Sequence, residues 1–280
     1  MCMNIINEVR NQLNKAQFRS PQLFYISCWL ANKITGMTTS QLLTTDEVLS
    51  NEQREQLEQC VYELTVLKKP IQYVLGTVEF CGLSLKVQPP ILIPRPETEE
   101  WVQAMIKRLV RDKTSATILD IGTGSGCVAL ALASALPAAR VLGVDCSAQA
   151  LVLAQENKRL LNIINVDFAE SDLFASVKGK FDVIISNPPY VAECEWQQLE
   201  DPVRIWEDKK ALVADDRGLA LLKCIIEQSP LYLAQDGELV LEIGHAQGDA
   251  VCTFMRSCGY TDVEIYKDFA GCDRLVIGWR

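Results

Sequence analysis

The amino-acid sequence predicts an α/β protein in which a helical N-terminal segment precedes a seven-stranded sheet. Apolar residues recur at helical spacing through the first third of the chain, and residues 72–87 change to the short period of strands. From residue 117 onward, apolar strand segments alternate with amphipathic helices. Because buried strands that alternate with helices are typical of a parallel sheet covered on both faces, these patterns define the fold class.

Three helices are expected in the first 70 residues. Ile5–Leu13 places apolar side chains on one face of a helix. A second helix is expected to open with a serine cap and a proline at its first position, at Ser20–Pro21. Ser50–Gln53 has the spacing of a capping box and predicts a third start. We expect these helices to form one domain over residues 1–70.

A β-hairpin is expected between this helical domain and the sheet. Segments 72–80 and 83–87 have the character of strands and are separated by a short turn. Pro89-Pro90 then stiffens the chain. The predicted organisation is therefore a hairpin linker over residues 71–90 and a sheet domain over residues 91–280.

The sheet domain shows a regular alternation of strands and helices. Strands are expected near residues 117–121, 140–144, 166–170, 181–186, 238–243, 262–266 and 274–278. Helices are expected near residues 97–111, 126–135, 148–160, 218–228 and 247–257. Ligands of such sheets bind at the carboxyl ends of the strands, so the loops that follow the strands are the candidate sites.

Composition excludes several classes of protein. The chain has 280 residues and a net charge of −9, and residues 91–280 carry all of that charge, which opposes binding through nucleic-acid phosphates. His245 is the single histidine, so paired-histidine catalysis and most histidine metal sites are excluded, and we expect no metal. The 11 cysteines show no C-x-x-C spacing, and residues 1–8 do not resemble a signal peptide. We expect a cytoplasmic protein without a membrane partner.

A glycine-rich turn follows the first predicted strand of the sheet. Glycines let the backbone pass close to a ligand, and the start of the next helix offers free amides. The turn consists of Gly122, Thr123, Gly124, Ser125 and Gly126. This G-x-G-x-G spacing differs from the G-x-G-x-x-G of dinucleotide sites. The alternative interpretation is a tight turn without a ligand.

An acidic residue, Asp145, ends the second predicted strand. A carboxylate at this position can accept hydrogen bonds from both hydroxyls of a ribose. The alternative is that Asp145 interacts only with the amides of the helix that follows it.

The most specific motif follows the fourth predicted strand and has the sequence Asn187-Pro188-Pro189-Tyr190. The asparagine oxygen and a proline carbonyl can accept both hydrogens of a planar NH2 group, and the tyrosine ring can stack on that plane. Such a clamp orients a weak nitrogen nucleophile without strong base chemistry. The alternative is a turn that is merely shaped by its prolines.

Together these motifs resemble those of S-adenosylmethionine-dependent methyltransferases that methylate planar amino groups. The N6-adenine methyltransferases and the protein-glutamine N5 methyltransferases of peptide-chain release factors share the Asn-Pro-Pro-Tyr motif. Five further stretches resemble the release-factor family in the same order, and they are Pro70–Gly76, Leu92–Glu99, Ser171–Phe174, Leu241–Gly244 with Gln247-Gly248, and Asp268–Arg274. The resemblance covers nearly the whole chain.

The resemblance implies a class I, Rossmann-like methyltransferase sheet with S-adenosylmethionine as cofactor. It implies that Gly122–Gly126 line the methionine end of the cofactor, that Asp145 holds the ribose and that Leu173 lies against the adenine. Asn187 would touch both cofactor and substrate, and Asn187–Tyr190 would clamp the target amide. Glu97 is expected beside the pocket.

The sequence departs from the family pattern at three places. Leu173 stands where the family often has a bulkier aromatic residue, residues 206–210 lack the family's Glu-Pro pair, and residues 214–216 replace a glycine-rich stretch. The last two segments are expected in a loop on the substrate side.

The implied reaction transfers a methyl group to the side-chain nitrogen N5 of the glutamine in the Gly-Gly-Gln motif of release factors. We expect a monomer whose domain 1–70 docks the release factor, without nucleic acid as a partner. An N6-adenine methyltransferase would need a basic cleft, which the charge opposes. A non-catalytic ribosome-associated module would have lost the asparagine or the glycines, and a nicotinamide oxidoreductase would need a different glycine spacing.

Overall fold

The computed structural model describes residues 4–280 and divides into two compact units. One unit runs up to Thr77 and includes Glu200–Trp206, and the other holds Val78–Leu199 and Glu207–Arg280. Residues 1–3, on which part of the signal-peptide prediction rests, lie outside the described residues. The division differs from the predicted borders at residues 70 and 90, because the expected linker is shared between the two units.

The described part of the first unit is built from helices joined by short loops. Its helices are α1 (Asn4–Lys15), α2 (Leu23–Thr35), α3 (Thr39–Thr44), α4 (Asn51–Thr65), α5 (Ile71–Leu75) and α9 (Asp201–Trp206). The predicted apolar stripe of α1 is buried. Leu13 of α1 and Leu30 of α2 are fully enclosed in the same core. Ser50 caps α4 as predicted, since its hydroxyl accepts from the Gln53 amide and its own amide donates to Gln53 Oε1 at 2.8 Å.

Two N-terminal predictions are wrong in detail. The second helix begins at Leu23, because the Ser20 hydroxyl accepts from the Gln22 amide at 3.1 Å and closes a turn before the helix. Residues 72–75 belong to α5 and not to a strand. Tyr73 and Val74 are both buried although they are consecutive, and a strand would point them to opposite sides. The first strand of the hairpin therefore begins only at Thr77.

The second unit is built on a seven-stranded mixed sheet. The strands are β3 (Thr117–Ile121), β4 (Arg140–Asp145), β5 (Val166–Glu170), β6 (Phe181–Ser186), β9 (Leu233–Glu242), β10 (Thr261–Lys267) and β11 (Asp273–Trp279). Their order is β10-β11-β9-β6-β3-β4-β5. The prediction of a parallel sheet is wrong at β11, which is antiparallel to both β9 and β10. Only a short loop joins β10 to β11, and such a connection permits a hairpin but no crossover.

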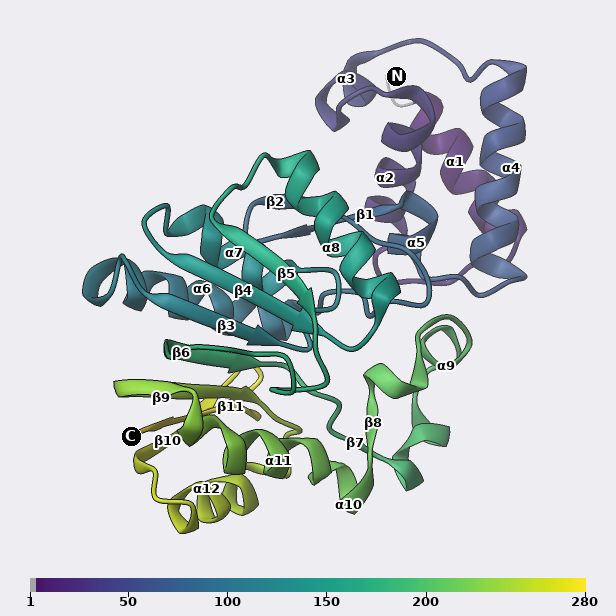
Figure 1. Cartoon of the computed structure of the whole chain (residues 1–280). Helices are drawn as coiled ribbons and strands as arrows, with labels where there is room; N and C mark the ends of the chain where they lie inside the picture. The colour runs from purple at the N-terminus through teal and green to yellow at the C-terminus, as the bar shows by residue number, and fades with distance from the viewer. Residues whose placement is uncertain (1–3) are drawn as a thin grey trace. The chain divides into compact units, whose positions relative to one another are not determined.

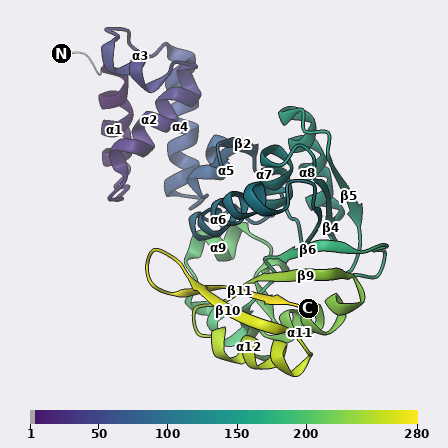
Figure 2. The same ribbon diagram turned by 90° about the vertical axis from the view of Figure 1, so that its left-hand side faces the viewer.

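Helices cover both faces of this sheet, as predicted (Figures 1 and 2). One face packs against α6 (Pro96–Asp112), α7 (Cys127–Ala135) and α8 (Ala148–Leu161), and the other packs against α11 (Ala220–Gln228) and α12 (Gly248–Ser257). The smaller elements are β1 (Thr77–Phe80), β2 (Leu83–Lys86), β7 (Val191–Ala192), η1 (Glu193–Gln198), η2 (Lys209–Ala211), β8 (Val213–Ala214), α10 (Asp215–Gly218) and η3 (Ser229–Leu231). Among residues 4–280, no helix has the length and apolar character needed to cross a membrane.

Candidate active site

The loops that follow three parallel strands meet at one edge of the sheet. Ile121 at the end of β3 lies opposite Val144 of β4 and Ser186 of β6. The Ser186 hydroxyl donates to the Ile121 carbonyl at 2.7 Å. Asp145 lies opposite Glu170 of β5. The register therefore brings the glycine turn, the acid of β4 and the Asn-Pro-Pro-Tyr turn side by side.

The glycine turn is held against β4. The amides of Gly122 and Thr123 donate to the Val144 carbonyl at 2.8 and 3.0 Å. Gly143 allows this close approach, because a Cβ there would lie 2.6 Å from the Phe168 ring and 2.8 Å from Thr123 Oγ1. A side chain at Gly143 would push the turn away from the strand.

The end of the turn is fixed as firmly as its beginning. The Gly126 amide donates to the Thr123 carbonyl at 2.8 Å, and Asn157 of α8 donates to the Ser125 carbonyl at 3.0 Å. Ser125 is buried, and Gly126 is the N-cap of α7. The turn thus delivers the free amides of a helix start to the edge of the sheet.

Two backbone amides hold the Asp145 carboxylate at the end of β4. Its Oδ2 accepts from the Gly124 amide at 2.8 Å, and its Oδ1 accepts from the Ser147 amide at 2.9 Å. Ser147 is the N-cap of α8. Each carboxylate oxygen has further acceptor capacity, so two hydroxyl groups of a ligand can still be bound.

A second acid, Asp120 at β3, supports the glycine turn through a hydrogen bond. It was not among the predicted site residues. It is only 2% exposed, and Thr123 donates its hydroxyl to it at 2.7 Å. Burial raises the pKa of Asp120 to about 6, although the bond from Thr123 opposes the shift. Its position at the end of an apolar strand was the available sequence signal.

Leu173 lies in the loop that follows β5. Its backbone has a φ of 48°, a left-handed conformation that costs a leucine about 1 kcal/mol. Ser171 supports this conformation, because its hydroxyl donates to the Leu173 carbonyl at 2.9 Å and accepts from the Ser176 amide at 3.0 Å. Leu173 is half-buried against the apolar core, in the loop that begins where the Ser171 amide donates to the Asp145 carbonyl at 3.0 Å.

The Asn-Pro-Pro-Tyr turn is anchored at both ends. Asn187 donates through Nδ2 to the Thr98 hydroxyl at 3.3 Å. Pro188 is buried and Pro189 is half-buried. The Tyr190 hydroxyl donates to Glu242 Oε1 at 3.1 Å. Burial, reinforced by the nearby Glu242 charge, raises the pKa of Tyr190, so the phenol keeps its proton.

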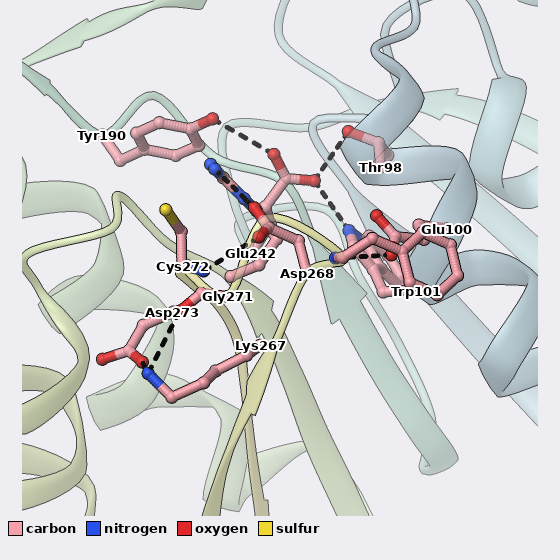
Figure 3. Close-up of polar contacts among 12 residues, drawn as sticks. Thr98, Glu100, Trp101, Tyr190, Glu242, Lys267, Asp268, Gly271, Cys272 and Asp273 are labelled. Carbon is pink, nitrogen blue, oxygen red and sulfur yellow. Dashed lines mark hydrogen bonds and ion pairs between the residues drawn. The ribbon is translucent and has the colours of Figure 1, made fainter.

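Glu242 is the principal residue that sequence reasoning missed. It is 0% exposed, and three side chains converge on it, two from α6 and one from the turn after β6 (Figure 3). Thr98 and Trp101 of α6 donate to Oε2 at 2.7 and 2.8 Å, and Tyr190 donates to Oε1. Burial raises the pKa of Glu242, and these hydrogen bonds oppose the rise. The available sequence signals were an acid at the end of an apolar strand and the family-like stretch Leu241–Gly244 that contains it.

Glu97 lines a cavity of about 230 Å³ that lies between α6 and the β10–β11 hairpin. Trp101 and Arg274 also line it, so the cavity adjoins the Glu242 cluster. Arg274 pairs with Asp268 at 3.0 Å. Thr98, the neighbour of Glu97, is the residue of this segment that reaches Asn187.

His245 and Asp216 are not part of this site. His245 is exposed beyond the end of β9. Asp216 pairs with Lys223 at 2.6 Å. Among the described residues, no group of three or more histidine, cysteine or acidic side chains could hold a metal ion.

The sheet carries three features at one edge: a glycine turn, an acid at the end of the neighbouring strand and an Asn-Pro-Pro-Tyr turn. Together they define an S-adenosylmethionine-dependent methyltransferase of class I. Two family models match the chain, the "PrmC N-terminal domain" over residues 4–76 and the "Methyltransferase small domain" over residues 99–201. The chain belongs to the release factor glutamine methyltransferase family, because named members of that family match it over nearly its full length.

Relatives named release factor glutamine methyltransferase match from three quarters to nearly all of the chain. The protein of Thermodesulfovibrio yellowstonii is 35% identical over 98% of this chain and 98% of its own length. That of Buchnera aphidicola is 36% identical over 99% of this chain and 98% of its own length. That of Vibrio cholerae is 42% identical over 75% of this chain and 73% of its own length.

A solved structure supports the fold independently. A methyltransferase from Pyrococcus furiosus superimposes with a TM-score of 0.53 at 19% identity, covering 82% of this chain and 98% of that one. At this identity the similarity shows the fold alone. It confirms the predicted class I sheet.

Proposed function

We propose that this chain transfers the methyl group of S-adenosylmethionine to the side-chain nitrogen N5 of the glutamine in the Gly-Gly-Gln motif of peptide-chain release factors. One observation carries the proposal. Ile121 and Ser186 are paired in register, so the glycine turn and Asn187 emerge from neighbouring strands. A methyl donor on the turn and an amide on Asn187 would then be adjacent, and the family supplies the substrate class.

The cofactor site is proposed to be Gly122–Gly126 with Asp145, Leu173 and Asn187. The geometry fits the cofactor, because a Cβ at Gly122 or Gly124 would meet nothing within 4 Å and the turn therefore faces open space. Asp145 keeps acceptor capacity for two ribose hydroxyls, and Leu173 offers an apolar face to the adenine. S-adenosylmethionine, when bound, supplies an electrophilic methyl group.

The clamp is proposed to be Asn187, Pro188, Pro189 and Tyr190. Asn187 Oδ1 and the Pro188 carbonyl accept the two hydrogens of the glutamine amide, and the Tyr190 ring stacks on its plane. These contacts turn the amide nitrogen toward the methyl group, so orientation supplies the catalytic advantage. As the carbon–nitrogen bond forms, the sulfur–carbon bond breaks, and the nitrogen afterwards loses one proton.

The N-terminal unit is proposed to dock the release factor. Three aromatic side chains on α2 are exposed, with Phe24 at 41%, Tyr25 at 61% and Trp29 at 40%. Their rings contact one another, with centroids 5.8 and 6.5 Å apart. Exposed aromatic clusters of this kind are typical of binding surfaces.

We further propose that the enzyme is a cytoplasmic monomer.

The charge favours a protein substrate over nucleic acid. Residues 91–280 hold the whole net charge of −9, which would repel phosphates and attract a basic protein surface. An N6-adenine methyltransferase is therefore the weaker alternative.

The test is methyl transfer from labelled S-adenosylmethionine to a bacterial-type release factor or to adenine-containing nucleic acid. We expect label on the Gly-Gly-Gln glutamine and none on a release factor with that glutamine replaced by alanine. Asn187→Ala should abolish transfer while cofactor binding, measured by calorimetry, is partly kept. Label on nucleic acid only would refute the proposal, and full activity of Asn187→Ala would refute the clamp.

A further inference from the structure

We infer that Thr98 and Glu242 are positioning residues that determine which end of the Asn187 side-chain amide faces the substrate. The inference rests on the proposed function and deepens it. An asparagine amide has an oxygen and a nitrogen of nearly equal size, so packing alone leaves either orientation open. Hydrogen bonds decide between them.

The donor at Trp101 determines the direction of the first bond. An indole N–H can only donate, and Trp101 donates to Glu242 Oε2 at 2.8 Å. Oε2 is therefore an acceptor. The Thr98 hydroxyl lies 2.7 Å from the same oxygen and gives its single proton to it.

Thr98 then has only acceptor capacity left for Asn187. A carbonyl oxygen of Asn187 facing Thr98 would place two acceptors against each other, whereas the amide nitrogen donates at 3.3 Å. The chain from Trp101 through Glu242 and Thr98 thus directs Nδ2 of Asn187 toward α6. Its Oδ1 is left for the substrate amide, whose hydrogens require an acceptor.

The arrangement is independent of the charge on Glu242. Burial raises the pKa of this carboxyl group. Because Thr98 and Trp101 both donate to Oε2, a proton taken up by the carboxyl group belongs on Oε1. Oε2 stays an acceptor for Thr98 in either state. Because Thr98 is 2% exposed and Glu242 is 0% exposed, these bonds are shielded from bulk solvent.

The test compares two replacements of Thr98 that differ in the hydroxyl group. Thr98→Val keeps the shape and removes the hydroxyl, whereas Thr98→Ser keeps the hydroxyl and removes a methyl group. With a release factor as substrate, we expect Thr98→Val to lower kcat roughly ten- to a hundredfold, the scale of a misplaced reactive group. The KM for S-adenosylmethionine should stay unchanged, and Thr98→Ser should restore most of kcat.

A second measurement does not depend on activity. In the protein alone, the Asn187 side-chain NH2 signals, assigned by their loss in Asn187→Ala, should show one hydrogen-bonded proton in NMR. That proton should persist in Thr98→Ser and disappear in Thr98→Val. If Thr98→Val does not fold in thermal unfolding, Thr98→Ala takes its place in both measurements.

The outcomes separate the two proposals. Equal kcat values and equal Asn187 signals in Thr98→Val and Thr98→Ser would overturn the positioning role and leave the proposed function intact. A wild-type protein that does not methylate the release factor would overturn the proposed function. The NMR comparison would still decide whether Thr98 orients Asn187.

Discussion

Replacement of Gly218 by alanine should displace the clamp without touching the substrate. Gly218 ends α10 with a φ of +83°, and a Cβ built there would lie 2.0 Å from the Tyr190 carbonyl oxygen and 2.7 Å from its carbon. The same carbonyl accepts from Gln247 Nε2 at 2.9 Å. A methyl group at Gly218 would therefore collide with backbone and disturb the bond that holds it.

The size of the effect follows from these contacts. Real Cβ contacts are not shorter than 3.0 Å, so the Tyr190 backbone or Gly218 must move by about 1 Å. A displacement of this size at a reacting group lowers the rate by roughly a hundredfold. The positive φ adds about 1–2 kcal/mol to the loss of folding free energy. We expect both effects in Gly218→Ala.

Gly259→Ala is the matched control, since Gly259 has a φ of +87° but nothing within 4 Å of its Cβ position. In urea unfolding, both variants should lose a similar free energy of unfolding because of the positive φ. Gly218→Ala should lose more because of the collision. Only Gly218→Ala should lose kcat for the release factor, with cofactor binding kept in calorimetry. Equal kcat values for the two variants would refute the link between Gly218 and Tyr190.

Two further predictions concern Asp120 and Trp29. Because burial raises the pKa of Asp120 from 3.8 to about 6, the folded state keeps a proton that the unfolded chain loses, and this stability is lost as the pH rises through the folded value. Up to about 3 kcal/mol of unfolding free energy should be lost from about pH 4 to about pH 7. This loss should be missing in Asp120→Asn. Identical pH profiles of the wild type and Asp120→Asn in urea unfolding would contradict the prediction. Trp29→Ser should raise the KM for the release factor roughly tenfold at unchanged kcat. Its control is Tyr62→Ser, which changes an aromatic residue on α4 that is 48% exposed. Equal KM values in the two variants would contradict docking on α2.

The sequence predicts most of the sheet because strand and helix periods depend on local order. The four strands of the seven-stranded sheet that precede Asn187 are predicted correctly within a residue, and the loops that hold Asp145 and the glycine turn follow from them. Residues 72–75 were predicted as a strand, because only the tertiary structure shows that Tyr73 and Val74 are buried together. The pairing of β11 with β9 is likewise a tertiary contact, although the short loop after β10 already requires β11 to run antiparallel to β10.

Glu242 could not be found from the sequence for a related reason. Its importance arises from its neighbours, and Trp101 and Tyr190 lie 141 and 52 positions away along the chain. The sequence motif ends at Tyr190, whereas the physical unit includes α6 and the end of β9. Motifs identify residues that are contiguous in the chain, and the cluster that orients them is contiguous only in space.

The titratable groups around the clamp explain how methyl transfer can proceed in a chain with one histidine. Burial raises the pKa of Tyr190, which therefore stays a hydrogen-bond donor. Glu242 is enclosed by three donors, so its oxygens serve as fixed acceptors and do not collect the proton of the substrate. His245 is exposed beyond the strand end. In the proposed mechanism, the ionisable side chains of the clamp thus serve to orient the amide.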